Sequence, residues 1–428
     1  MAATPIAVDE LRVGMYIQLD GGWLSHPFPL SNFRIAGPDQ LQTLRGLGLA
    51  RVRWVPEKSL PLALPAAAAS DQALPPADAA EQREAACQVQ QPADGLAQQQ
   101  ADWLAAQRES ARLCERQYGE ASTAWRGAVE ALVARPQDAG STSRQLAQAM
   151  LDKMLAAEDV GIRLVAGGGD RHAAHALNVT VIALLIGRTL GLDEDQLIDL
   201  GVGALLHDVG KQEIAERYRH LEDGFSAPEA AAYRDHVAQG VTQGRRMALA
   251  PGALAVLAQH HEHADGSGFP AQMAGDRMSM AARIVAIVDR YDKLCNPGPG
   301  SPAVTPHQAV AMLFAQGRQR YDTTVLNTFI RMMGVYPAGS LVQLTDDRYA
   351  MVVGVNSSRP LKPRVLVHQP GATELLDLER LPDLGIRRSL APGKVPGAAL
   401  QALDPRPRVA YYFEPIARER LVPVRAAP

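Results

Sequence analysis

Histidine and aspartate side chains of the kind that bind metal ions are concentrated in one part of the sequence. Eight of the eleven histidines lie between His172 and His263, although a lone histidine on a helix is more often a packed residue than a ligand. Together with nearby carboxylates they supply nitrogen and oxygen donors and no sulfur, as in di-iron and di-manganese hydrolytic centres and less typically in structural zinc sites. We therefore predict two divalent ions, iron or manganese, held by His175, His207, Asp208, His236, His260, His261 and Asp289.

The segment from His207 to Lys211 follows an apolar stretch, which puts three polar groups at the end of a buried helix. Spacings of three and four residues bring His207, Asp208 and Lys211 to one face. An aspartate can bridge two cations, and a lysine one turn later can neutralise a phosphate without binding metal. Asp208 and Lys211 are the predicted catalytic residues, although a His-Asp pair could also simply cap a helix end.

A second polar segment, His260-His261-Glu262-His263, leads directly into a loop with two glycines and a proline. Glycine permits positive φ and a close approach by a ligand, and proline stiffens the exit from the loop. We expect this loop to contact substrate, the alternative being a polar surface turn after a helix. The predicted substrate-binding residues are Lys211, Asp265, Gly266, Ser267, Gly268, Phe269 and Pro270.

Apolar helices are expected to carry the remaining ligands. His175 precedes an apolar run at helical spacing and so shares its buried face. His236 is expected at the end of a helical stretch before Gly240. Asp289 follows several aliphatic residues, where an unpaired carboxylate would be costly to bury and a metal ion would remove that cost.

The length of 428 residues favours two or three domains, at roughly 100–200 residues each. An apolar stripe along a long predicted helix suits packing within its own domain or, as the alternative, pairing of two chains in a homodimer. Alternating patterns predict a hairpin over 341–355 and a third strand at 364–367. The predicted fold is mainly α, a helical bundle with a small N-terminal α+β module and a small C-terminal β-hairpin extension. The predicted parts are 1–58, the α+β module; 59–95, an Ala/Pro-rich linker; 96–135, a long helix; 141–336, the helical metal-binding domain; and 337–428, the β extension with an irregular tail.

Composition excludes several functional classes. Hydrophobic residues at 47% and a formal charge of −3 match a globular protein and give no electrostatic footprint for DNA or an anionic membrane. Three widely spaced cysteines fit neither a disulfide framework nor a metal motif. The sequence predicts no secretion signal and no membrane span, so we expect a cytoplasmic location. The motifs GxxxxGK[ST], GxGxxG and GxSxG are absent, which leaves phosphate-loop and serine-nucleophile chemistry without support.

In order and spacing, the metal-binding motifs resemble those of the HD-GYP domain. The likeness covers about 141–367 and rests on six blocks in register: His175, His207-Asp208 with Lys211, His236, His260-His261-Glu262, Asp265 to Pro270, and Asp289. Residues 5–133 look like the accessory domain that often precedes HD-GYP domains in bacteria, on the strength of Leu11-Arg12-Val13-Gly14-Met15 with Trp23, Pro27 and Phe28. The resemblance implies the helical bundle of the HD superfamily for 141–336.

The resemblance also implies an activity, the hydrolysis of the second messenger cyclic di-GMP to linear pGpG and sometimes on to GMP. By matching position, His175, His207, Asp208 and Asp289 would hold one ion, and Asp208 would bridge to a second held by His236, His260 and His261. Two cations roughly 3.5–4 Å apart lower the pKa of a bridging water, and the resulting hydroxide can attack phosphorus. Lys211 would grip a phosphate oxygen and help stabilise the negative charge that develops.

Three positions depart from the pattern of the HD-GYP domain. Phe269 stands where the family has the tyrosine of its GYP triplet, which removes a hydroxyl. Arg171 occupies the position where members with a third ion carry glutamate, so we expect two ions. The residues after Asp292 read Lys293-Leu294-Cys295-Asn296-Pro297-Gly298-Pro299-Gly300, without the Arg-Pro-Tyr segment that helps bind substrate phosphates in the family.

Three functions are consistent with these features. The favoured function is a metal-dependent phosphodiesterase acting on a cyclic dinucleotide. The alternative is a weak or inactive sensor of the dinucleotide, or a docking module for a GGDEF diguanylate cyclase, and the missing Arg-Pro-Tyr segment supports it. A hydrolase of another nucleotide would account for the His207-Asp208 pair but would leave the loop from Gly266 to Pro270 unexplained.

Overall fold

The computed structural model describes residues 4–19, 32–35, 37, 41–42, 44–45, 49, 51–59, 93–167, 169–220, 225–298, 300–356 and 361–416. Most of the predicted linker, together with Trp23, Pro27 and Phe28, lies outside these residues. Contacts divide the chain into two compact units. Apart from residues 23–29, the first unit ends at Arg112 and the second begins at Leu113.

The first unit contains a small antiparallel sheet with the strand order β1-β4-β2-β3. Ile17 and Val52 are buried, whereas the residues on either side of them are half-buried or exposed, as expected for strands with one covered face. The small N-terminal strands predicted from the sequence are therefore present. Their bounds are β1 Thr4–Ala7, β2 Tyr16–Gln18, β3 Asn32–Arg34 and β4 Arg51–Trp54, with 3₁₀ turns at Val8–Glu10 and Pro56–Lys58.

Helix α3 (Ala93–Ala131) is the long helix expected over 96–135. From Cys114 onward its apolar stripe packs into the core of the second unit, where the indole nitrogen of Trp125 donates a hydrogen bond to the Leu205 carbonyl at 2.8 Å. This packing is the intrachain alternative for the stripe. The interruption expected between 135 and 141 is instead the first turn of α4 (Pro136–Leu155), because proline is tolerated at the start of a helix.

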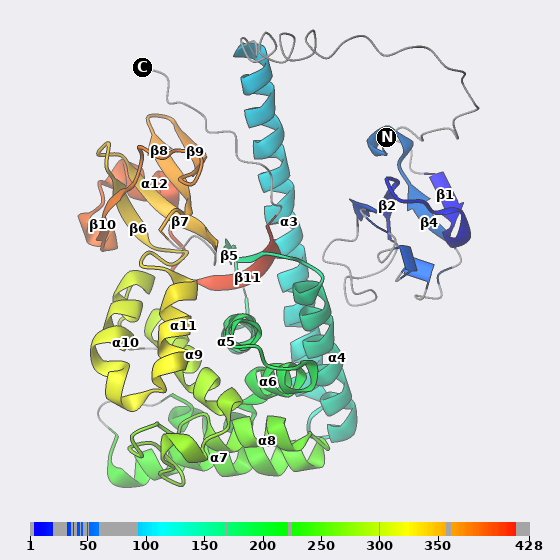
Figure 1. The fold of residues 1–428 in the computed structure, drawn as a ribbon. Helices are drawn as coiled ribbons and strands as arrows, with labels where there is room; N and C mark the ends of the chain where they lie inside the picture. The colour runs from blue at the N-terminus through cyan, green and yellow to red at the C-terminus, as the bar shows by residue number, and fades with distance from the viewer. Residues whose placement is uncertain are drawn as a thin grey trace, which may run out of the picture. The chain divides into compact units, whose positions relative to one another are not determined.

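Further helices build the bundle of the second unit around α5 (Figure 1). Helix α5 is buried on most of its surface and packs against α6, α9 and α11, which suits a helix whose central residues are nearly all apolar. Capping side chains fix several helix starts, such as Asp193 with Gln196 at α6. The helices are α5 Arg171–Thr189, α6 Glu194–Leu206, α7 Ala227–Arg246, α8 Pro251–Gln259, α9 Met280–Cys295, α10 Pro306–Arg320 and α11 Thr323–Met333, with a 3₁₀ turn η4 at Val209–Glu213.

A seven-stranded antiparallel sheet lies beside the bundle, with the path β10-β6-β7-β5-β11 and with β8 and β9 added beyond β7 (Figure 1). The hairpin predicted over 341–355 is confirmed as β6 and β7, and the third strand is β8. The bounds are β5 Val160–Val165, β6 Leu341–Leu344, β7 Tyr349–Asn356, β8 Arg364–Gln369, β9 Ala372–Asp377, β10 Ile386–Leu390 and β11 Ala410–Pro415, with α12 at Gly397–Leu403.

Two features of this sheet differ from the sequence prediction. Strand β5 lies inside the part predicted to be mainly helical, and the residues after Gly371, predicted to be an irregular tail, form β9, β10, α12 and β11. Strands β5 and β11 pair with each other, Arg163 opposite Tyr412, so each is stabilised by a partner far away in the sequence. Within the described residues, no helix combines the length and the apolar character needed to cross a membrane.

Candidate metal centre

Five separate segments bring the predicted ligands to one place in the bundle. Helix α6 ends at Leu206, so His207 is its C-cap and Asp208 opens the 3₁₀ turn η4. This turn packs closely on α7, because a Cβ at Gly210 would lie 2.0 Å from the His236 carbonyl oxygen. His236 lies in the middle of α7 and faces Asp208. The prediction that His236 ends a helical stretch is wrong, because α7 continues to Arg246.

The first group of donors, cluster A, consists of His175, His207, Asp208 and Asp289, whose potential ligand atoms all lie within 4.8 Å of one another. His175 Nε2 is 3.0 Å from His207 Nε2 and 3.2 Å from Asp289 Oδ1. Asp208 Oδ2 lies 3.4 Å from the same His175 nitrogen. Helices α5, α6 and α9 thus each direct a donor into one small volume.

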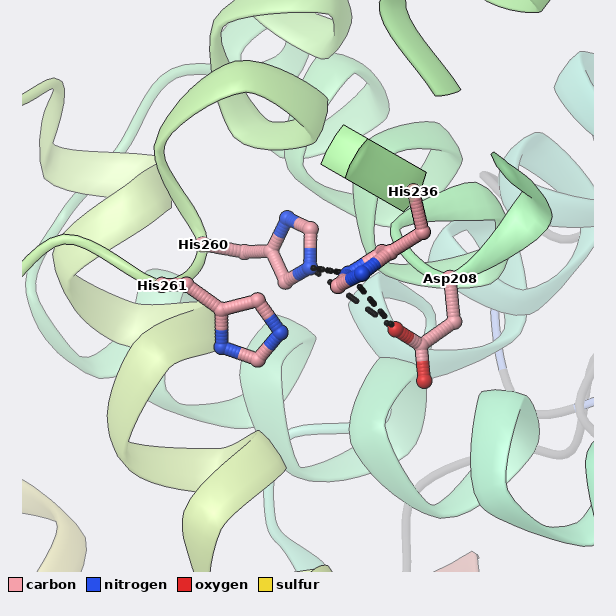
Figure 2. Close-up of side chains that lie close together, drawn as sticks. All are labelled: Asp208, His236, His260 and His261. Atoms are coloured by element: carbon pink, nitrogen blue, oxygen red, sulfur yellow. Dashed lines mark hydrogen bonds and ion pairs between the residues drawn. The ribbon is translucent and has the colours of Figure 1, made fainter. Parts of the chain in front are cut away.

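The second group, cluster B, consists of Asp208, His236, His260 and His261, again within 4.8 Å (Figure 2). His236 Nε2 and His260 Nε2 are 3.3 Å apart, and they lie 3.6 and 3.7 Å from Asp208 Oδ1. Asp208 belongs to both clusters, and its two oxygens face different ones. The structure therefore brings together all seven residues predicted as ligands.

The second ring nitrogens of these histidines are occupied by hydrogen bonds. The Nδ1 atoms of His207, His236 and His260 lie 2.6–3.0 Å from the backbone carbonyls of residues 204, 233 and 257. A carbonyl accepts only, so Nδ1 carries the proton and Nε2 keeps its lone pair for the cluster. This is the usual arrangement of histidines that bind a metal ion.

The carboxylate that joins the clusters fits metal ions better than it fits protein partners. Asp208 Oδ1 is buried, and no described residue donates a hydrogen bond to it. A buried carboxylate oxygen without a partner is costly unless a cation binds it. The oxygen and nitrogen donors, the free Nε2 lone pairs and this unpaired oxygen are together what a pair of divalent transition-metal ions requires.

Burial and charge keep Asp208 and two of the histidines in the protonation states that metal binding needs. Burial lowers the pKa of His236 to about 3, and the negative charge of Asp208, which raises this pKa, has the smaller effect. Burial and the neighbouring His260 hold the pKa of His261 well below its usual value. Burial raises the pKa of Asp208, but Lys211 and Lys293 outweigh it, so the net pKa lies well below the ordinary range. These two imidazoles are neutral and the carboxylate is ionised.

Two lysines contact the carboxylates of the clusters, namely Asp208, which both clusters share, and Asp289, which belongs to cluster A. Lys211 Nζ donates to Asp208 Oδ2 at 2.7 Å, as its spacing predicted. Lys293 Nζ lies 2.7 and 2.8 Å from the two oxygens of Asp289 and 3.7 Å from Asp208 Oδ2. Lys293 was not predicted to be part of the site, although its four-residue spacing from Asp289 on α9 was a readable signal.

The loop from Asp265 to Pro270 folds back onto cluster B. The Phe269 ring stacks on His261 at a centroid distance of 4.6 Å, and its backbone nitrogen donates to the His261 carbonyl at 3.1 Å. A Cβ on Gly268 would lie 2.5 Å from the Glu262 Cα, so the chain can pass there only with glycine. Asp265 accepts hydrogen bonds from Ser267, which stabilises the exposed part of the loop.

Glu262, the carboxylate within the second polar segment, anchors this loop. It is buried, and its two oxygens accept hydrogen bonds from the backbone nitrogens of Ala271 and Met273 at 2.6 and 2.9 Å. It therefore holds the loop against α8 and lies outside both donor clusters.

A supporting network behind cluster A was missed from the sequence. Asp292 Oδ2 lies 2.7 Å from His175 Nδ1, and its other oxygen accepts hydrogen bonds from the amides of Asn178 and Asn296. Asn178 in turn accepts a hydrogen bond from the backbone of Tyr411 in β11. The spacings of Asp292 from Asp289 and from Asn296 were the only local signals, because His175, Asn178 and Tyr411 are distant in sequence.

Family models match two successive parts of the chain. Residues 140–325 match the family model described as an HD domain, and residues 4–140 match a domain of unknown function, DUF3391. The resemblance predicted from the sequence is confirmed, in that the match to the HD domain model covers both donor clusters and a different model matches the residues before it.

Three relatives illustrate what this chain is similar to. A cyclic di-GMP phosphodiesterase of Pseudomonas aeruginosa is 26% identical over 387 residues, covering 89% of this chain and 88% of the relative. A cyclic di-GMP phosphodiesterase response regulator of Xanthomonas campestris is 31% identical, over 35% of this chain and 40% of its own length. A 3'3'-cGAMP-specific phosphodiesterase of Vibrio cholerae is 29% identical, over 37% of this chain and 30% of its own length.

Proposed function

We propose that this chain is a metal-dependent phosphodiesterase that hydrolyses cyclic di-GMP to linear pGpG, with further hydrolysis to GMP as a second step. The observation that carries the proposal is the convergence of six nitrogen and oxygen donor residues, in two clusters, on the shared carboxylate of Asp208. The two similar proteins from Pseudomonas and Xanthomonas that are named cyclic di-GMP phosphodiesterases support this substrate.

Cluster A and cluster B would each hold one divalent ion, iron or manganese by the donor set, with Asp208 shared. Such ions supply an activated water and charge stabilisation for in-line attack on phosphorus. The protein keeps the imidazole Nε2 atoms aimed inward through the hydrogen bonds at Nδ1. It also provides a positive charge, Lys211, beside the shared carboxylate, where a phosphate oxygen can be neutralised.

Substrate contacts are proposed for Lys211 and for Asp265, Gly266, Ser267, Gly268, Phe269 and Pro270. Asp265, Ser267 and Pro270 are exposed, and Phe269 is partly exposed beside His261. A ring in that position can contact a nucleobase or ribose while keeping the imidazole in place. The hydroxyl that Phe269 lacks is the difference from the family pattern at this point.

A cyclic dinucleotide sensor with little turnover is the second candidate, and one observation favours it. The segment that follows Asp292 is engaged in packing: Asn296 exchanges hydrogen bonds with the backbone of Val409, and the Pro297 carbonyl accepts one from Arg171. It offers no arginine for a substrate phosphate. Docking on a GGDEF-domain protein, a homodimer and a cytoplasmic location remain predictions that accompany either candidate.

The test is a hydrolysis assay on the full chain reconstituted with Mn²⁺ or, anaerobically, Fe²⁺. Cyclic di-GMP and 3'3'-cGAMP are incubated separately with the protein, and linear products are separated by chromatography. We expect pGpG from cyclic di-GMP and a rate at least ~10³-fold lower for Asp208→Ala, which removes the carboxylate common to both clusters.

The matched control is Asp195→Ala, which removes an exposed carboxylate from the same helix α6. Its rate should equal that of the wild type. Tight binding of cyclic di-GMP without product would favour the sensor, and preferential cleavage of 3'3'-cGAMP would change the proposed substrate.

A further inference from the structure

Lys293 is a charged residue of the centre to which the proposed reaction assigns no role. Its ammonium contacts both oxygens of Asp289, at 2.7 and 2.8 Å. Pairs four residues apart are common on helix surfaces, where they only tie side chains together. This pair differs because Asp289 is 3% exposed and its Oδ1 atom also lies 3.2 and 3.3 Å from His175 and His207.

The carboxylate oxygens that Lys293 contacts all face cluster A. Asp289 belongs to cluster A alone, and the Asp208 oxygen that faces the same cluster, Oδ2, has Lys293 at 3.7 Å and Lys211 at 2.7 Å. Asp208 Oδ1, which faces cluster B, accepts no hydrogen bond from a described residue and has only imidazole nitrogens beside it.

An ion in cluster A must therefore bind carboxylate oxygens that already carry an ammonium. Like charges in a buried site repel strongly, so either the ion binds more weakly or the lysine must leave Asp289. Cluster B offers an oxygen that accepts no hydrogen bond from a described residue, and no salt bridge to an ammonium group has to be broken there. The ligands alone would not predict this ranking, because cluster A has two carboxylates and cluster B has one.

We propose that Lys293 acts as a counter-cation of Asp289, so that cluster B binds its divalent ion first and cluster A binds the second ion more weakly. This inference rests on the proposed function only in assuming that the two clusters hold ions. Lys293 is thus a positioning residue that sets how much metal is needed to fill the centre.

Metal content is the direct measurement. The chelator-treated full chain is dialysed against Mn²⁺ at graded free concentrations, and bound manganese per chain is counted by mass spectrometry. We expect a tight and a weak step for the wild type. Lys293→Met should tighten the weak step at least about tenfold, since a buried like charge has been removed. Lys293→Arg keeps the charge and should retain two separate steps.

Two further variants assign the steps. His175→Ala should remove the weak step and leave the tight one, whereas His260→Ala should remove the tight one. The control is Arg290→Met, which removes an exposed cation of the same helix α9. Lys293→Gln gives the same comparison with a side chain that can still donate a hydrogen bond to Asp289, should the methionine variant fold poorly.

Thermal unfolding provides an independent readout. Without metal, Lys293→Met leaves Asp289 unpaired and should lower the melting temperature, and saturating Mn²⁺ should restore more of it than it adds to the wild type. Identical binding steps in wild type and Lys293→Met, or a tight step assigned to His175, would overturn the inference. A wild-type chain that binds no Mn²⁺ or Fe²⁺ at all would instead overturn the proposed function.

Discussion

The two donor clusters share Asp208 but differ in their ligand residues and in the charges beside them. Cluster A combines two histidines with two aspartates and has two ammonium groups beside it. Cluster B combines three histidines with one aspartate oxygen to which no described residue donates a hydrogen bond. The secondary-structure elements that carry the two clusters differ as well. Helices α5, α6 and α9 carry cluster A, and η4, α7 and the end of α8 carry cluster B.

The supports behind the clusters differ even more than the ligands. Cluster A is held from outside the bundle, because Asp292 and Asn178 connect His175 to the backbone of β11 near the end of the described chain. Cluster B is held locally, by carbonyls one helical turn away and by the loop that stacks Phe269 on His261. The comparison teaches that one centre can depend on two unrelated parts of the chain.

The largest difference is expected from Asp292→Asn. The Asp292 oxygens accept from His175 on one side and from two amides on the other. If the side-chain oxygen of the introduced asparagine keeps the contacts with the two amides, the NH₂ group of the same side chain faces His175 Nδ1. The NH₂ group can only donate a hydrogen bond to Nδ1, so the imidazole proton must lie on Nε2, where the ion would bind. The affinity for the ion in cluster A should fall about 10–100-fold.

Manganese content at graded free Mn²⁺ measures this loss. The step assigned to cluster B should stay within about twofold of the wild-type value. The control is Asp195→Asn, which changes an exposed carboxylate outside both clusters, and both of its steps should also stay within about twofold of the wild-type values. Equal weakening of both steps by Asp292→Asn would show that the two clusters are not supported separately.

The same network marks the limit of what the sequence could predict. All seven donors were found because histidines and aspartates at apolar helical positions are chemically unusual. Asp292, in contrast, owes its role to Asn178, and Asn178 owes its orientation partly to Tyr411, 233 residues away. No local pattern contains such a contact.

The fold divides in the same way. The helices were predictable because their periodicity and caps are local, and so was the β6–β7 hairpin, whose strands are joined by a short turn. Strand β5 is a six-residue, mostly apolar segment between helices, and its pairing with β11 places Arg163 opposite Tyr412. A short apolar run is ambiguous between helix and strand until its distant partner is known.

A smaller effect, confined to cluster B, is expected from Gly268→Ala. The added methyl would lie 2.4 Å from the His263 nitrogen and 2.5 Å from the Glu262 Cα, so backbone must move to admit it. We expect the free energy of unfolding to fall by about 1–3 kcal/mol and Phe269 to shift from His261. Urea denaturation measures the first effect and the cluster B manganese step the second.

The control for this substitution is Gly127→Ala on helix α3. Nothing lies within 4 Å of a Cβ at that exposed helical position, so the change should stabilise the protein by about 0.5–1 kcal/mol through helix propensity. Similar destabilisation by both substitutions would contradict the close approach at Gly268.

The smallest effect tests whether cluster B depends on a side-chain hydrogen bond or only on its backbone. Tyr233 contributes to both kinds, since its carbonyl accepts from His236 at 2.6 Å and its hydroxyl lies 3.3 Å from His261 Nε2. Tyr233→Phe removes only the hydroxyl. Because that hydroxyl competes with an ion for the Nε2 lone pair, with a long hydrogen bond of about 0.5–1.5 kcal/mol, its loss should raise the affinity of cluster B by about 2–10-fold. Tyr218→Phe is the matched control and should change neither manganese step. A fall in the affinity of cluster B in Tyr233→Phe would mean that cluster B, like cluster A, needs a side-chain partner to orient its imidazoles.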